Sequence, residues 1–308
     1  MELNPETKKI VEEFKKLKLP SVPEVGVAEA RKQYSILAHF SHDKEPLAKV
    51  EDRTIPGIDG DIPVRIYTPE GAGEFPMLVY FHSGGWVLGD LEVEDSVCRI
   101  FANGAGCVVV SVDYRLAPEH KFPAAAEDAY TATQWMAKNA AAINGDSSRI
   151  AAGGLSAGGN LAAVVALMAR DRGEPSLIYQ LLLDPVTQHG FDTESYRKHA
   201  NDFLVTTEDM VWYWNQYLPS PAEGKNPYAS PLLAEDLTNL PPALIMSAGC
   251  DVLRDDGKGY SDRLRDAGVP VKFSIYEGTI HAFIRTKSLS QSREALAEAV
   301  AGLTAAFN

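Results

Sequence analysis

A Gly-x-Ser-x-Gly pentapeptide near the middle of the chain separates a stretch that suits a β-strand from one that suits a helix. It spans residues 154–158, with the apolar stretch 149–153 before it and the alanine-rich run 161–170 after it. In so tight a strand-to-helix turn the side chains next to the serine would collide, and glycine removes the Cβ atoms that would clash. Ser156 is therefore expected to present its hydroxyl at the positive end of the following helix.

An acid and a base lie downstream of Ser156, each where a strand gives way to a loop. A serine hydroxyl is a poor nucleophile until a base removes its proton, and that base needs an orienting carboxylate. Asp251 follows the β-like stretch 243–249, and His281 follows the alternating stretch 271–276. The carboxyl ends of strands in an open parallel sheet form the edge where ligands bind. We therefore predict that these three side chains meet at one edge of a parallel sheet.

A glycine pair follows another strand-like stretch, upstream of the serine. Residues 77–81 are apolar and run into His-Ser-Gly-Gly-Trp at 82–86. Because glycine lets backbone N–H groups face outward, such a pair favours binding of an oxyanion. We interpret His82 as a structural brace of this loop.

Two more motifs complete the pattern: Asp-Tyr-Arg-Leu-Ala-Pro-Glu-His at 113–120 and His-Ala-Phe at 281–283. With these, most of the chain from about residue 50 onward resembles the hormone-sensitive-lipase-like family of α/β-hydrolase carboxylesterases. The resemblance implies an α/β-hydrolase fold, with a mostly parallel central sheet, helices on both faces and a helical cap. It also implies these roles: Ser156 as nucleophile, His281 as base, Asp251 as the acid that orients the base, and the N–H groups of Gly84, Gly85 and Ala157 as the oxyanion hole.

The chain departs from the family pattern at three positions. Ser83 stands where the family usually has glycine, Leu155 where it has a small polar residue, and Val252 where it has proline. A glycine at the first position usually means a positive φ or a close approach. With serine there, two outcomes are open: the loop relaxes and misaims the Gly84 and Gly85 amides, or the serine hydroxyl bonds locally and holds the loop. We expect these departures to affect rate and specificity more than reaction class.

Strand-like and helix-like segments indicate how the chain is organised. Residues 1–45 are predicted to form N-terminal cap helices, the first capped by Asn4 and the second over 28–40. From residue 77 onward strand and helix alternate, as in a parallel sheet covered on both faces. Residues 46–185 and 231–308 are therefore assigned to the catalytic domain. Residues 186–230 break the alternation and are interpreted as a helical cap insertion.

Apolar side chains of the cap and the catalytic loops are expected to wall a short substrate pocket. Trp212 and Trp214 are two residues apart and cannot share one helix face, so one of them is expected to pack in the core. The candidate pocket residues are Trp86, Phe203, Leu204, Trp212, Trp214, Leu253 and Ile280. Separately, four charged residues are expected to form one buried ion-pair network: Asp113, Arg115, Glu119 and Asp128.

The motifs predict a serine carboxylesterase that works through an acyl-enzyme, without cofactor or metal. The resemblance to the family implies that its esters have short to medium acyl chains. Two alternatives stay open. One is an amidase or peptidase of the same fold, which normally carries a larger accessory domain than 308 residues allow. The other is a catalytically impaired, ligand-binding homologue, although all three candidate catalytic positions are occupied.

Composition sets the remaining expectations. A net charge of −13 argues against nucleic acid or an anionic membrane surface as partner. Three cysteines, Cys98, Cys107 and Cys250, suggest buried thiols in a reducing compartment, although a Cys98–Cys107 bridge is compatible with the sequence. The charged start of the chain lacks the apolar core of a signal peptide, and there is no apolar run of membrane-spanning length. We expect a cytoplasmic protein that binds a small-molecule ester, with a homodimer possible by family analogy.

Overall fold

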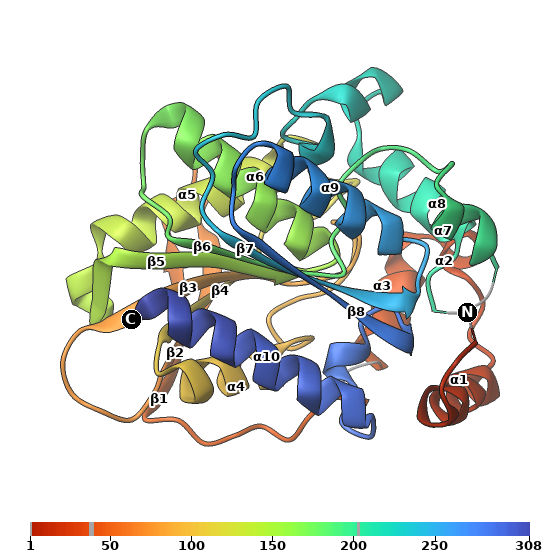
Figure 1. The fold of residues 1–308 in the computed structure, drawn as a ribbon, viewed down its shortest axis with the longest axis horizontal. Coiled ribbons are helices and arrows are strands. Elements are labelled where there is room, and N and C mark those ends of the chain that lie inside the picture. The colour runs from red at the N-terminus through yellow and green to blue at the C-terminus, as the bar shows by residue number, and fades with distance from the viewer. Residues whose placement is uncertain (1, 37–39, 202–203) are drawn as a thin grey trace.

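The computed structural model describes residues 2–36, 40–201 and 204–308. Within these residues eight strands form one sheet in the order β1-β2-β4-β3-β5-β6-β7-β8 (Figure 1). β2 pairs antiparallel with both β1 and β4, and the other neighbours are parallel. The strands are β1 (Lys49–Ile55), β2 (Ile62–Thr68), β3 (Phe75–Phe81), β4 (Val108–Val112), β5 (Gly145–Leu155), β6 (Tyr179–Leu183), β7 (Ala243–Cys250) and β8 (Val271–Ile280).

Helices cover both faces of this sheet (Figure 1). α4 (Asp95–Ala105) and α10 (Ser290–Phe307) lie on one face, and α5 (Ala124–Lys138), α6 (Ala157–Arg172) and α9 (Arg254–Asp266) lie on the other. The residues of β3 alternate between two cores: Leu78 and Tyr80 join the cluster that holds α4 and α10, and Val79 joins the cluster that holds α5 and α6. A strand buried on both faces needs apolar residues throughout, which explains the unbroken apolar run at 77–81.

The N-terminal segment forms three helices: α1 (Pro5–Leu17), α2 (Val22–Val25) and α3 (Val27–Ile36). The side chain of Asn4 accepts a hydrogen bond from the Thr7 amide at 2.7 Å, so the predicted cap of the first helix is confirmed. The predicted second helix corresponds to α3 as far as residue 36, and residues 37–39 lie outside the described residues.

The segment between β6 and β7 combines short helices with irregular chain. It contains α7 (Glu194–Lys198), α8 (Thr207–Tyr217) and 3₁₀ turns at Pro221–Lys225 and Pro231–Leu233. A reciprocal pair of bonds between Thr206 and Asp209 caps α8 at its N-terminus. α2 packs against α8, so the start of the chain and this segment lie together at the end of the sheet toward which β8 points (Figure 1).

Candidate active site

Ser156 lies in the turn between β5 and α6, with φ 60° and ψ −117°. This backbone conformation is rare for a residue with a side chain, and it is held by the close packing around it. A Cβ on Gly158 would lie 1.9 Å from the Phe81 carbonyl oxygen, and one on Gly154 would lie 2.3 Å from the Gly158 oxygen. Only glycine fits at these two positions, which explains the pentapeptide. Ser156 is 7% exposed and borders a cavity.

Ser156, His281 and Asp251 form a continuous chain of hydrogen bonds. His281 Nε2 lies 2.9 Å from Ser156 Oγ, and His281 Nδ1 lies 2.7 Å from Asp251 Oδ2. A carboxylate can only accept, so Nδ1 carries the proton and Nε2 is left to accept from the serine hydroxyl. The other Asp251 oxygen accepts the Leu253 amide at 3.0 Å, which fixes the carboxylate. The predicted meeting of these three side chains at one sheet edge is thus observed.

Opposing effects act on the protonation of His281. Burial by itself lowers the pKa of the imidazole, because the charged form loses hydration. The negative charge and hydrogen bond of Asp251, together with the charge of Asp184, favour the imidazolium and outweigh burial. The pKa of His281 is therefore raised, with Arg285 opposing weakly. A base with such a pKa takes up a proton more readily than a free imidazole does.

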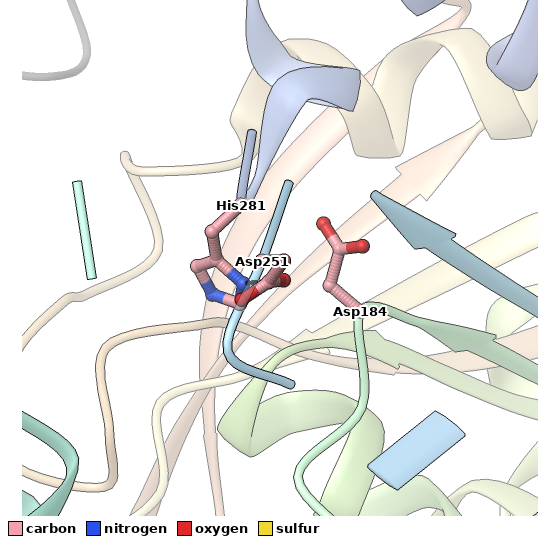
Figure 2. Close-up of side chains that lie close together, drawn as sticks. All are labelled: Asp184, Asp251 and His281. Atoms are coloured by element: carbon pink, nitrogen blue, oxygen red, sulfur yellow. Dashed lines mark hydrogen bonds and ion pairs between the residues drawn. The ribbon is translucent and has the colours of Figure 1, made fainter. Parts of the chain in front are cut away.

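Asp184 is a third buried group beside Asp251 and His281, and sequence reasoning missed it (Figure 2). It directly follows β6, so the strand-end argument that selected Asp251 and His281 applied equally to this residue. One ligand atom from each of the three lies within 4.8 Å of the others, a spacing that could suit a metal ion. However, the His281 nitrogen and the Asp251 oxygen bind each other, and both Asp184 oxygens accept amide hydrogen bonds. A metal ion bound by His281 Nδ1 would have to break the bond between this nitrogen and Asp251.

The loop after β3 places Gly84 and Gly85 on the wall of the cavity that contains Ser156. Both have positive φ, at 120° and 61°. A Cβ would lie 2.1 Å from the Leu88 oxygen at Gly84 and 2.2 Å from the Tyr213 ring at Gly85. Glycine is therefore required for both conformation and space. Ala157, the third expected donor, is the first residue of α6, where amides have no partner within the helix.

Ser83 is held by a buried polar cluster. Its hydroxyl bonds to the carboxylate of Glu94, to Tyr34 Oη at 2.7 Å and to Arg285 Nη1 at 3.2 Å. Its amide also donates to Glu94 at 3.1 Å, and its φ lies outside the positive range. Of the two outcomes left open by the sequence, the geometry corresponds to the second: the hydroxyl bonds locally and fixes the loop to α3, to the start of α4 and to the segment after His281.

His82 and Tyr114 contact the same loop and stabilise it. The two rings stack at 4.3 Å, and Tyr114 Oη donates to the His82 carbonyl at 2.8 Å. His82 Nδ1 lies 2.8 Å from the Ser83 carbonyl oxygen. These contacts agree with the interpretation of His82 as a structural residue.

A cavity of about 420 Å³ opens above Ser156. Its wall is mostly apolar. The wall is formed by residues of α1, α3, the loop after β3 that carries Gly84 and Gly85, and the segment around α8. The apolar side chains that line the cavity include Val11, Phe14, Leu204, Val205, Met210 and Tyr213. The charged side chains on its wall include Lys15, Asp209 and Arg285. Such a cavity can hold an apolar group of moderate size next to the serine.

Comparison with known proteins shows to which family this chain belongs. A family profile described as "alpha/beta hydrolase fold" matches residues 78–285. Carboxylic ester hydrolase LipN of Mycobacterium tuberculosis is 46% identical over 244 residues, 76% of this chain but only 64% of LipN. An arylesterase of Saccharolobus solfataricus is 35% identical over 94% of this chain and 95% of its own length. The solved hyperthermophilic esterase of Pyrobaculum calidifontis is 44% identical, with a TM-score of 0.94 over 99% of each chain. The chain belongs to the hormone-sensitive-lipase-like family of α/β-hydrolases.

For this α/β-hydrolase, the predicted fold class is confirmed by the family profile and by the solved esterase. The structure also bears on the cysteine pair and on membrane-spanning helices. Cys98 and Cys107 are buried and form no disulfide with each other. Across residues 2–36, 40–201 and 204–308, no helix has both the length and the apolar character that crossing a bilayer requires.

The pocket wall of this α/β-hydrolase differs from the predicted one. Of the candidates, Leu204 lines the cavity and Phe203 lies outside the described residues. Trp86 and Trp214 are fully buried, and Trp86 stacks on Tyr217 at 4.2 Å, so both belong to the core under the loop. The other candidates also lie off the cavity wall, with Trp212 half-buried against Tyr213 and two residues buried behind the site, Leu253 and Ile280. The Trp86 and Trp214 rings therefore bury their large apolar surface in the core and not on the cavity wall.

The predicted ion-pair network is divided. Arg115 binds Asp128 at 2.8 Å and the exposed Asp59 at 3.0 Å. Glu119 instead binds Arg31 of α3 at 2.7 Å, with both side chains partly exposed. Asp113 faces His82 at 3.8 Å. The partner from α3 lies far away in sequence, so charge spacing within residues 113–128 could not indicate it.

Proposed function

We propose that this chain is a serine carboxylesterase that hydrolyses short- to medium-chain esters through an acyl-enzyme. The hydrogen-bonded chain Ser156–His281–Asp251, at the floor of an apolar cavity, is the observation that carries the proposal. The named esterases among its relatives agree with it. Ser156 serves as nucleophile, His281 as general base and acid, and Asp251 as the group that orients the imidazole.

The reaction proceeds in two halves. Ser156 Oγ attacks the ester carbonyl carbon as its proton passes to His281 Nε2, and the carbonyl oxygen becomes an oxyanion. The N–H groups of Gly84, Gly85 and Ala157 stabilise that oxyanion. The carbon–oxygen bond to the alcohol then breaks, and the alcohol leaves with the His281 proton. Water attacks the acyl-enzyme by the same route, releasing the acid and restoring the Ser156 hydroxyl.

The α1–α3 segment and the segment around α8 form the cap of this site in the proposal. Both contribute side chains to the cavity wall, including Phe14 and Met210. A cavity of about 420 Å³ accommodates an acyl group of moderate length rather than a long-chain triglyceride. The substrate is therefore a small-molecule ester. A homodimer and a cytoplasmic location stay predictions, which light scattering and fractionation can check.

Hydrolysis of p-nitrophenyl butyrate by the purified chain tests the proposal. Ser156→Ala and His281→Ala should each lower kcat by about 10⁴–10⁶, and the double variant should be little worse because the residues act as a unit. Asp251→Asn should cost less. Ser247→Ala, at a buried serine on β7, is the matched control and should keep most activity. A phosphonate ester should label Ser156 only, as read by mass spectrometry. Unchanged hydrolysis by His281→Ala, or no hydrolysis by the natural chain, would refute the assignment.

A further inference from the structure

Asp184 is a buried carboxylate with an unusual backbone conformation, next to two of the proposed catalytic residues, Asp251 and His281. It follows the last residue of β6, is 1% exposed and has a positive φ of 41°. Its amide donates to the Met246 carbonyl oxygen of β7 at 2.8 Å, so its backbone is fixed by the sheet. A positive φ is uncommon for a residue with a side chain, and a buried carboxylate is costly unless it is paired. Two unfavourable features at one residue need a compensating contact.

The carboxylate of Asp184 supplies that contact by joining two loops. One oxygen accepts the Ala248 amide at 2.7 Å, and the other accepts the Ala282 amide at 2.8 Å. Ala248 lies near the end of β7, at the irregularity that leads to Asp251. Ala282 directly follows His281 and itself has a positive φ of 58°. One side chain therefore sets the distance between the strand end that carries the acid and the loop that carries the histidine.

The same carboxylate contributes charge. Figure 2 shows Asp184 beside Asp251 and His281, and one of its oxygens lies within 4.8 Å of the ligand atoms of both. The two oxygens of Asp184 accept both amides, whereas an asparagine in its place would present an NH₂ group to one of the two donors. When ionised, Asp184 places a second negative charge beside the imidazole, on a different element from Asp251.

We propose that Asp184 is a positioning residue for His281, fixing its loop through the Ala282 amide and adding a second negative charge next to the imidazole. This role rests on the proposed function, because it concerns the residue assigned there as base. It is distinct from that of Asp251, which binds the imidazole directly at Nδ1.

The charges around His281 fix the sign of the expected effect. Asp251 and Asp184 raise the pKa of the imidazole, whereas burial and Arg285 lower it. Burial raises the pKa of Asp184 to about 7, and Asp251 adds to this, whereas His281 and the two amides oppose it. The Asp184 charge therefore acts on His281 mainly at neutral pH and above. Asp256 is a further buried carboxylate near Asp251. Removing the Asp184 charge should therefore lower the pKa of His281 and shift the acid limb of kcat/KM, which reports the free base, to lower pH.

The experiment compares Asp184→Asn with the natural chain, using p-nitrophenyl butyrate across pH 5–9 or so. We expect kcat to fall about 10- to 100-fold with KM within about threefold, because the base is misplaced but the cavity is intact. The acid limb should move down by about half to one pH unit. Asp184→Ser, a smaller neutral variant, should show the same shift of the acid limb. It can be measured in place of Asp184→Asn if the asparagine variant unfolds.

Asp256→Asn is the matched control. Asp256 is also a fully buried carboxylate and accepts the Thr187 amide at 3.0 Å, so its loss tests the general cost of removing such a group. It should lower thermal stability without moving the acid limb. An acid limb at its natural position in a folded Asp184 variant, or the same movement in Asp256→Asn, would overturn the inference. If the natural chain hydrolysed no ester, the proposed function itself would fail instead.

Discussion

Replacing Ser83 by glycine restores the residue that the family usually has at this position and removes three side-chain hydrogen bonds. The bonds join the serine hydroxyl to Glu94, to Tyr34 and to Arg285. Its amide bond to Glu94 does not depend on the side chain and should persist. The change therefore separates two functions of this position, stability of the loop and aim of the oxyanion donors.

The contacts that Ser83→Gly removes and those that it leaves intact set the expected changes in stability and in kcat. Each of the three lost bonds contributes about 1 kcal/mol net, and the added backbone freedom of glycine costs about 0.5–1 kcal/mol, so the free energy of unfolding should fall by at most about 4 kcal/mol. Glu94 keeps Tyr80 as a donor at 2.7 Å, which limits the loss. The donor loop is fixed independently, since the Val87 and Leu88 amides both donate to the Gly84 carbonyl. We therefore expect kcat to change by less than about tenfold, well short of the 10²–10³ that a lost oxyanion donor costs.

Thermal unfolding and butyrate kinetics on Ser83→Gly and the natural chain measure both effects. Ser83→Ala removes the hydroxyl without adding backbone freedom, and should reproduce most of the stability loss. Ser247→Ala, at another buried serine, should change stability little. A gain in kcat of a hundredfold or more on restoring glycine would mean that Ser83 disables the loop. A stability equal to that of the natural chain would mean that the three bonds contribute nothing.

Other measurements address the pocket, the donor loop and the base. Across p-nitrophenyl esters, each buried CH₂ should contribute roughly 0.8 kcal/mol, which is about a fourfold rise in kcat/KM, up to about four to eight carbons. Beyond that length kcat/KM should fall, and a profile still rising with long-chain esters would contradict the cavity assignment. Gly85→Ala should lower kcat by about 10²-fold or more because its Cβ would strike the Tyr213 ring, whereas Gly26→Ala, also at positive φ but in open space, should lower stability alone. The acid limb of kcat/KM should lie above 6.5, since the pKa of His281 is raised from that ordinary value, and activity should fall as pH drops through it; a limb below pH 6 would refute that balance of charges.

Short-range chemistry explains what the sequence determined. The elbow around Ser156 and the glycines at 84 and 85 were predictable because a few adjacent residues decide whether a tight turn can form. The cap of α1 was predictable from Asn4 and the proline after it for the same reason. Strand ends could be located from apolar runs, and parallel strands bring their carboxyl ends to one edge, so Ser156, Asp251 and His281 could be grouped without coordinates.

The tertiary structure decided every feature that depends on partners distant in sequence. α3 brings Tyr34 to Ser83 and Arg31 to Glu119, and α1 brings Phe14 to the cavity, although nothing near Ser156 in the chain indicates these contacts. Packing likewise decided which aromatic rings are core and which are wall, because burial depends on the shape of neighbouring elements rather than on residue type. Asp184 shows the same limit: its position at a strand end is readable, but only the folded backbone brings the Ala248 and Ala282 amides to its two oxygens.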